Sequence, residues 1–241
     1  MSESDGSADE SPKLELLHES QLLAGLSRKE LDEVDLASVM TRCQRGRVFF
    51  TAHDEPETIY FLKEGRVRLY RSSEGKQLTV ALLDRGMIFG ESSLLGQSHA
   101  GVFAEADEEC LLCVMPTAKL SALITRIPRI GLNLLQCVGH RLQRSQELAE
   151  EVAFWSVRRR LARAILDLDE RYGHPTLDGQ RIINRAFTQA QIAEMIGSTR
   201  ETVADLMGEL RRSELIDLRK RRIVILNGAA LRQAVLTAPL D

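Results

Sequence analysis

The chain of 241 residues lacks features that define whole classes of protein. No window approaches the roughly 18 uninterrupted apolar residues that a membrane-spanning helix needs. The first residues are acidic and rich in serine, where a secretory signal would be basic and then apolar. We therefore expect a cytoplasmic protein with no membrane partner.

Cysteine is scarce as well. The four cysteines are too few and too scattered for a disulfide framework, which agrees with a reducing compartment: Cys43, Cys110, Cys113 and Cys137. Cys110 and Cys113 have the spacing of half a metal site, but residues 110–115 are expected to form a strand, where residues three apart point to opposite faces. We interpret these cysteines as packing residues and predict no metal.

The signatures of catalysis are also missing. The sequence has no nucleophile–base spacing, no metal-ligand motif and no glycine loop that could hold a phosphate. We therefore expect neither an enzyme nor a cofactor. A net charge of −3 excludes little, because a binding face can be basic on an acidic protein.

The N-terminal half changes from helical to strand-like periodicity. Residues 1–12 are polar and acidic, so we expect a disordered leader there. Helical spacing follows, with a capping box from Ser27 to Glu30. Between 43 and 115, short β-type runs alternate with turn residues, which is typical of a small barrel or roll.

Two β-hairpins are predicted inside this region. The run 58–70 has two strand-like halves around Glu64-Gly65, which indicates one hairpin. A second hairpin is expected to turn at Glu74-Gly75.

A long helix is predicted from about 130 to 154, where there is no proline. Its apolar or small residues recur with gaps of three, four, three, four and three: Leu135, Val138, Leu142, Ser145, Ala149 and Val152. A seam of this period is what a coiled coil requires, so we expect the helix to pair with its copy in a homodimer. The alternative is a helix packed on its own barrel, and Ser145 could face a ligand instead.

The C-terminal region predicts a winged helix-turn-helix. A helix over 157–172 and a break over 173–179 precede a helix ending at Ile196, a turn at Gly197 and a helix over 199–211. Two short strand-like runs around residues 219–222 then complete the motif.

The second helix of such a unit enters the major groove of DNA, with its first residues nearest the bases. Arg200 could bind guanine and Glu201 could accept from cytosine. Thr188 would place a helix N-terminus at a phosphate, and the four adjacent cations of the wing would also contact phosphates. The alternative is an ordinary capped helix with a solvated charged face. The predicted DNA-binding residues are Thr188, Gln189, Ser198, Thr199, Arg200, Glu201, Asp205, Arg219, Lys220, Arg221 and Arg222.

Three stretches carry a resemblance that covers nearly the whole chain after the leader: "GRVFFTAHDEPETIYFLKEGRVRLY", "FGESSLLG" and "FTQAQIAEMIGSTRETVADLMGELRRSELI". In these stretches the sequence resembles the CRP/FNR family of dimeric transcription regulators. The resemblance implies an α+β fold with a cyclic-nucleotide-binding-type jelly roll (13–128), a dimerisation helix (129–156) and a winged helix-turn-helix (157–241). It also implies a palindromic operator in double-stranded DNA and RNA polymerase as a partner.

The effector pocket departs from the family pattern. Members that bind cyclic AMP hold the ribose with a Gly-Glu pair, matched here by Gly90 and Glu91, and the phosphate with an Arg-Ser pair. No arginine occurs between Arg85 and Arg126, and a buried phosphate without a guanidinium is costly. We therefore expect weak or no binding of cyclic AMP by a degenerate pocket of Gly90, Glu91, Ser92, His99, Ala100, Ser145 and Gln146.

Other sensors of the family fit less well. An iron–sulfur sensor needs an N-terminal cysteine cluster, and none precedes Cys43. Haem remains an alternative despite isolated histidines, and a 2-oxoglutarate type remains because Arg141 or Arg144 could point inward. We favour a regulator without a small effector. The five histidines are His18, His53, His99, His140 and His174.

The second departure is Asp205, where many family members have an arginine. An aspartate would accept from a base amino group, pair with Arg200 or Arg212, or stay off the DNA, and the ion pair with Arg200 or Arg212 is the structural alternative that we favour. We expect an operator that differs at one base pair of each half-site. A different class of function also stays open: a ligand-binding or protein-interaction module in which the helix-turn-helix is only a scaffold.

Overall fold

A computed structural model describes residues 20–52, 54, 57–95 and 101–237. These residues form two compact units: the first contains 20–72 and 81–143, and the second contains 73–80 and 144–237. The leader predicted at 1–12 lies outside the described residues. The domain boundaries inferred from the sequence stay a prediction.

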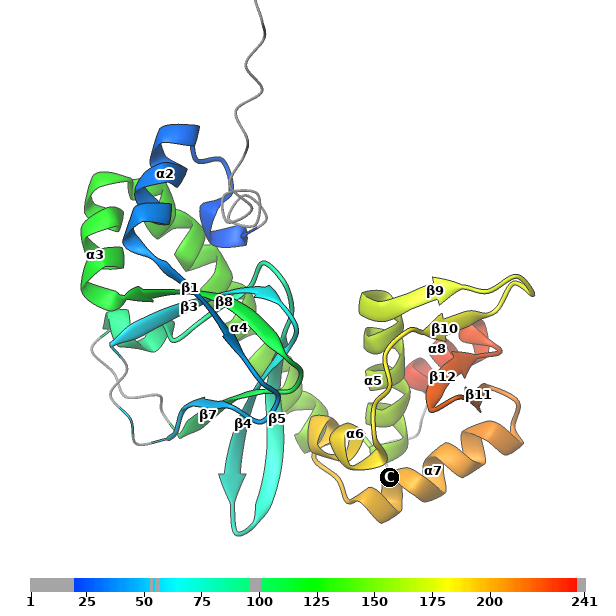
Figure 1. The fold of residues 1–241 in the computed structure, drawn as a ribbon. Coiled ribbons are helices and arrows are strands. Elements are labelled where there is room, and N and C mark those ends of the chain that lie inside the picture. Colours follow the sequence, from blue (N-terminus) through cyan, green and yellow to red (C-terminus); the bar gives the residue numbers. More distant parts are fainter. Residues whose placement is uncertain (1–19, 53, 55–56, 96–100, 238–241) are drawn as a thin grey trace, which may run out of the picture. The chain divides into compact units, whose positions relative to one another are not determined.

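The strand-rich half is a roll of two four-stranded sheets, which confirms the predicted jelly roll (Figure 1). One sheet has the order β1-β8-β3-β6 and the other β2-β7-β4-β5. The strands are β1 (Val39–Cys43), β2 (Val48–Phe50), β3 (Thr58–Glu64), β4 (Val67–Ser73), β5 (Lys76–Leu83), β6 (Ile88–Phe89), β7 (Val102–Ala106) and β8 (Cys110–Pro116).

The two predicted hairpins have different outcomes. The Glu74-Gly75 hairpin is confirmed, because β4 and β5 are neighbours in one sheet and both turn residues have positive φ. The Glu64-Gly65 hairpin is wrong, since β3 and β4 belong to different sheets. Gly65 has φ +84°, and a Cβ there would collide with the Glu109 carbonyl oxygen. The chain therefore crosses from one sheet to the other at this glycine.

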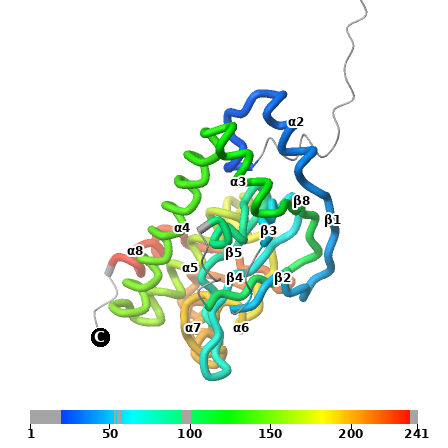
Figure 2. Tube along the Cα trace, turned by 90° about the vertical axis from the view of Figure 1, so that its left-hand side faces the viewer, coloured from blue at the N-terminus to red at the C-terminus, as the bar shows by residue number. Residues whose placement is uncertain are grey.

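Short helices cover one face of the β1-β8-β3-β6 sheet. Alternate side chains such as Ile59, Phe61 and Met115 are buried in this core, as period-2 alternation requires. Both views place α2 beside α3 at one end of the roll (Figure 2). The predicted capping box is present, with the Ser27 N–H donating to Glu30 Oε2 at 2.7 Å. The helices are η1 (Gln21–Leu23), α2 (Arg28–Ala37), η2 (Glu91–Leu95) and α3 (Thr117–Arg126).

The predicted long helix is α4 (Pro128–Phe154), which begins with a proline, the residue whose missing N–H costs least in a first turn. Along it runs the α4 stripe, the predicted seam of Leu135, Val138, Leu142, Ser145, Ala149 and Val152, of which all but the half-buried Val138 are exposed. Leu135 is 69% exposed and Leu142 is 59% exposed. Such an apolar row is unusual for a surface, because large aliphatic side chains usually find cover.

The second unit contains the predicted helix-turn-helix and wing. Helices α5 (Val157–Tyr172), α6 (Gln189–Ile196), α7 (Arg200–Arg212) and α8 (Gly228–Thr237) share one apolar core (Figure 1). A four-stranded sheet with the order β11-β12-β10-β9 flanks them. Its strands are β9 (Gly173–Pro175), β10 (Arg181–Ile183), β11 (Ile216–Arg219) and β12 (Arg222–Ile225).

Two parts of this unit were not anticipated. The segment over 173–179, predicted only as a break, contains β9 and leads to β10, which extends the wing sheet. Its strands of three residues are too short for a clear alternation. Helix α8 was also missed, although its Leu231 is fully buried in the shared core.

A buried arginine holds the turn between α6 and α7. Helix α6 ends at Gly197 in the left-handed conformation, φ +61°, so its last carbonyls have no partner within the helix. Arg160 of α5, 8% exposed, donates from Nη1 to the carbonyl oxygens of Ile196 and Gly197, the latter at 3.2 Å. Burial lowers the pKa of Arg160, and the Glu151 carboxylate opposes that shift. The guanidinium thus ties α5 to the end of α6, where the turn to α7 begins.

Replacing this arginine should loosen the turn. Arg160→Met leaves two helix-end carbonyls without their donor, so we expect a loss of about 1–3 kcal/mol in the free energy of unfolding, measured by urea denaturation. Arg158→Met is the matched control, because Arg158 pairs with Glu209 of α7 at 3.0 Å on the surface, and such pairs contribute at most about 1 kcal/mol. Equal stability of the two variants would contradict the assignment.

Candidate nucleic-acid interface

Two capped helix N-termini carry the predicted reading residues. The Thr188 hydroxyl accepts from the Gln191 N–H at 3.1 Å and caps the N-terminus of α6, as predicted. The Thr199 hydroxyl accepts from the Thr202 N–H at 3.2 Å and begins α7. A capped helix start leaves other N–H groups available for an anion such as a phosphate.

Helix α7 separates an apolar face from a charged face. Val203, Met207 and Leu210 are buried in the core, as i, i+4 and i+7 of one stripe. Arg200, Glu201 and Asp205 are exposed, as are the neighbouring Thr199 and Gly197. Ser198 and Gln189 are half-buried. The structure therefore brings the predicted base-contacting side chains together on one solvent-facing surface.

Asp205 does not form the ion pair that we favoured from the sequence. Within the described chain, neither Arg200 nor Arg212 forms a salt bridge with it. Glu201 lies one turn before Asp205, so the two carboxylates share a face of α7. The carboxylate of Asp205 is available to an external donor.

The wing places its cations on a strained turn. Strands β11 and β12 pair with Arg219 opposite Arg222, so Lys220 and Arg221 are the two turn residues. Their φ values are +49° and +65°. Turns with two positive φ angles strongly prefer Asn-Gly, and long side chains in this conformation cost of order 1 kcal/mol or more each.

The four wing cations are not equivalent. Arg219 Nη2 donates to the Gln180 side chain at 2.9 Å, and its guanidinium lies 3.5 Å from Asp178 and 3.7 Å from Asp217. Arg219 is therefore partly neutralised inside the protein. Among described residues, Lys220, Arg221 and Arg222 have no such acidic partner and are exposed.

Sequence reasoning missed three residues that support this surface from behind or from the side. Arg160 stands in a run of three arginines, which resembles surface charge, and only its burial reveals the contact with the turn. Gln180 and Asp178 reach Arg219 because β10 pairs with β12, and no local pattern announces that pairing.

The predicted ribose carboxylate is already engaged. Glu91 pairs with Arg141 of α4, whose Nη2 also donates to the Ile88 carbonyl oxygen at 2.8 Å. Both side chains are largely buried. Ser92 is half-buried, Ser145 and Gln146 are exposed, and His99 and Ala100 lie outside the described residues.

Arg144, the other candidate for an inward-facing cation, has a different role. It bonds to Glu151 at 2.9 Å and lies 3.2 Å from both Glu147 and Asp167. These contacts join the end of α4 to α5. Arg144 is therefore bound by acidic side chains of its own unit.

The structure offers little support for a metal or reactive thiol. Burial raises the pKa of Cys110 to about 12, and it also raises the pKa of Cys43 and Cys137. In the described ranges no three His, Cys, Asp or Glu residues gather as metal ligands. His18, His53 and His99 lie outside those ranges, and His140 and His174 are exposed. None of the described helices is long and apolar enough to span a membrane.

Comparison with known proteins identifies the two units. Residues 40–126 match the cyclic nucleotide-binding domain model, and residues 159–234 match the Crp-like helix-turn-helix domain model. The chain is 34% identical over 221 residues to the global nitrogen regulator of Synechococcus elongatus, covering 90% of this chain and 98% of that protein.

Solved structures agree with this assignment. A transcriptional regulator of the CRP/FNR family from Thermus thermophilus is similar with a TM-score of 0.67 and 27% identity, over 83% of this chain and 100% of that one. A mutant of CooA from Carboxydothermus hydrogenoformans shares the fold, with a TM-score of 0.73 and 22% identity over 89% of this chain and 94% of that one. The chain belongs to the CRP/FNR family of transcription regulators, which bind DNA and are not enzymes.

Proposed function

We propose that this regulator binds a palindromic operator as a homodimer and acts without cyclic AMP. The observation that carries the proposal is the exposed face of α7, where Arg200, Glu201 and Asp205 stand together on the unit that also carries the three exposed cations of the wing, residues 220–222. Activity in the cytoplasm and contact with RNA polymerase are part of the same proposal.

Base reading is assigned to the first turns of α7. Arg200 donates bidentately to guanine O6 and N7, and Glu201 accepts from the cytosine amino group. Asp205 accepts from a further base amino group, which supports an operator altered at one base pair in each half-site. Each good pairing is worth about 1–3 kcal/mol of discrimination.

Phosphate contacts come from the wing and from the start of α6. Lys220, Arg221 and Arg222 supply positive charge, and Thr188 directs the N-terminus of α6 to a phosphate. The strain at Lys220 and Arg221 supports this role, because a turn selected for stability alone would have Asn-Gly there.

Dimerisation is assigned to the α4 stripe. Its exposed leucines repeat with the coiled-coil period and would be covered by the same stripe of a second copy. A two-fold-symmetric protein then binds half-sites whose centres lie about 34 Å apart.

Independence from cyclic AMP is supported by the Glu91–Arg141 ion pair. A ribose hydroxyl would have to compete with this guanidinium for Glu91, and the sequence has no arginine for the phosphate between 86 and 125. One oxygen of the Glu91 carboxylate, Oε1, thus already has a charged partner on α4.

A second candidate is a regulator controlled by a small dicarboxylate such as 2-oxoglutarate. Arg141 favours it, because this largely buried guanidinium could exchange Glu91 for a ligand carboxylate. The similarity to a protein named a global nitrogen regulator is compatible with such an effector.

Selection of bound duplexes from a random pool tests the operator. We expect a palindrome with half-sites about one helical turn apart and a preference that changes when Asp205 is replaced by arginine. The absence of any enriched palindrome would contradict the proposal and favour a module in which the helix-turn-helix is only a scaffold. In the same assay, Lys220→Asn/Arg221→Gly should reduce the slope of log K against log salt by about 4, because two phosphate contacts are lost in each of the two subunits. This variant should also unfold at higher urea, which separates weaker DNA binding from misfolding.

Charge on the α4 stripe should separate the subunits. Leu135→Glu/Leu142→Glu buries carboxylates in the proposed interface, so we expect at least about a 100-fold weaker dimer by sedimentation equilibrium. Leu36→Glu is the control, because Leu36 is 83% exposed on α2 and lies off the stripe. A monomeric parent protein at micromolar concentration would refute the homodimer.

Calorimetric titration distinguishes the two effector hypotheses. We expect no cyclic AMP binding at concentrations up to about 1 mM, because the phosphate lacks a cation. Binding of 2-oxoglutarate that is lost in Arg141→Gln would establish the second candidate. Micromolar binding of cyclic AMP would overturn the proposed independence.

A further inference from the structure

A cavity opens at the end of the roll where β1 turns towards β2, and neither Gly90 nor Glu91 lines it. Its volume is about 660 Å³, within the usual range for small-molecule sites. All its lining residues belong to the first unit: Thr41, Arg42, Cys43, Gln44, Arg45, Gly46, Arg47, Phe49, Tyr60, Leu112 and Val114.

One wall of the cavity, formed by β8 and three aromatic rings, is apolar and rigid. Leu112 and Val114 of β8 lie two residues apart and share one face of their strand. Tyr60 stacks on Phe89 with ring centroids 4.6 Å apart, and Phe49 packs against both rings at 5.3 and 5.1 Å. Three mutually packed rings leave little freedom to Tyr60, so the wall is formed before any ligand arrives.

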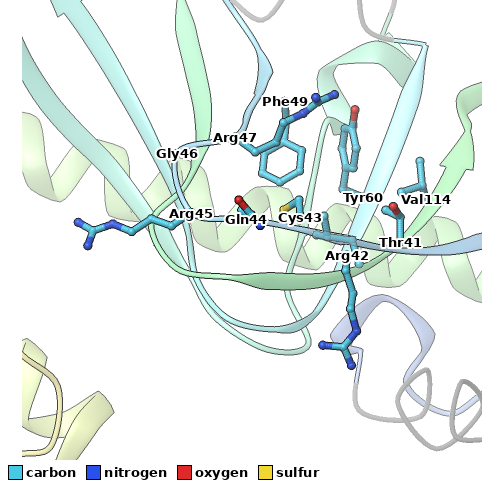
Figure 3. Close-up of a pocket in the computed structure, with 11 residues that line it drawn as sticks. Thr41, Arg42, Cys43, Gln44, Arg45, Gly46, Arg47, Phe49, Tyr60 and Val114 are labelled. Atoms are coloured by element: carbon cyan, nitrogen blue, oxygen red, sulfur yellow. The ribbon is translucent and has the colours of Figure 1, made fainter.

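One guanidinium is directed at this wall. Figure 3 shows Arg47 on the side of the Tyr60 hydroxyl, whereas Arg42 and Arg45 extend away. Burial raises the pKa of Tyr60 and the charge of Arg47 opposes that shift, which agrees with their proximity. Arg42 has a partner in Glu109 at 3.6 Å, but within the described chain Arg47 has no acidic partner.

The backbone holds Arg47 in place. The Gly46 N–H donates to the Ala106 carbonyl oxygen at 2.8 Å, and the Ala106 N–H donates to the Arg47 carbonyl oxygen at 2.9 Å. Gly46 has φ +84°, which turns the chain tightly between these two bonds. The base of the arginine is therefore fixed by β7, although its head is exposed.

We propose that this cavity binds a small aromatic carboxylate. The lining has three cations and no carboxylate, so it favours an anion. The Arg47 guanidinium, with the Tyr60 hydroxyl beside it, can donate to both oxygens of one carboxylate. A single inward-facing cation would neutralise only one of the two negative charges of a dianion. The ring of the ligand packs on Phe49 and Val114, which are both half-buried. This inference does not depend on the operator, the dimer or the pocket at Glu91.

Titration of the full chain with benzoate, and with benzamide as its neutral isostere, tests the site. We expect benzoate to bind with a dissociation constant below about 1 mM and benzamide at least about tenfold more weakly, because only the acid forms charge-assisted hydrogen bonds. Arg47→Gln should remove this preference. Arg85→Gln, the same charge change at an exposed residue outside the lining, should retain it.

Two further measurements locate the ligand. Val114→Phe, which fills the cavity, should abolish benzoate binding while the thermal midpoint shows that the protein is folded. Equal binding of benzoate and benzamide, equal losses in Arg47→Gln and Arg85→Gln, or displacement of benzoate by equimolar inorganic phosphate would overturn the proposal. No detectable benzoate binding at 25 °C and about 10 mM ligand would overturn it as well.

Discussion

The recognition surface depends on how the chain stops one helix and starts the next. Helix α6 ends in a left-handed glycine, and two of its carbonyl oxygens face the buried guanidinium of Arg160. Two residues later Thr199 caps α7, so the direction of the recognition helix follows from this short turn. A buried cation is costly unless it is hydrogen-bonded, and Nη1 of this cation donates to two helix-end carbonyls that also need donors, although its Nε has no partner among the described residues. The carbonyl oxygens gain a donor and the guanidinium gains acceptors at the same turn. The positions of Arg200 and Glu201 depend on this turn.

One cation of the wing is partly neutralised within the protein, and the others are left for a binding partner. Arg219 is held by Gln180 and nearby acidic groups, whereas the three cations after it have no acidic partner within the described chain. The same division appears on the long helix, where Arg141 and Arg144 are bound by carboxylates and the leucines are exposed. The wing cations without acidic partners are suited to bind a polyanion. The exposed leucines of α4 are suited to pack against a second copy of the chain.

Much of the architecture could be predicted because its signals are local. The capping box at Ser27, the period of α4 and the limits of α5 each follow from spacing over a few turns. The hairpin expected at Glu64-Gly65 failed because pairing between strands is not local: the Glu-Gly turn sends the chain into the other sheet. The strands β9 and β10 were missed for the same reason, since each has only three residues and is stabilised by its neighbours. The ion pair expected for Asp205 failed because spacing on a helix shows which side chains can meet, not which of them do.

By itself the sequence determined the succession of a strand-rich half, a long helix and a helix-turn-helix, the residues on the exposed face of α7, the seam of α4 and the absence of an arginine between 86 and 125. These properties depend on residue identity and on periods of two to seven residues. Only the tertiary structure decided that Arg160 is buried at the helix-turn-helix, that Glu91 is bound by Arg141, that Arg219 differs from its three neighbours, and that Arg47 stands beside an aromatic cavity. Each of these joins residues far apart in the chain, and burial and charge neutralisation are set by such neighbours rather than by the local pattern.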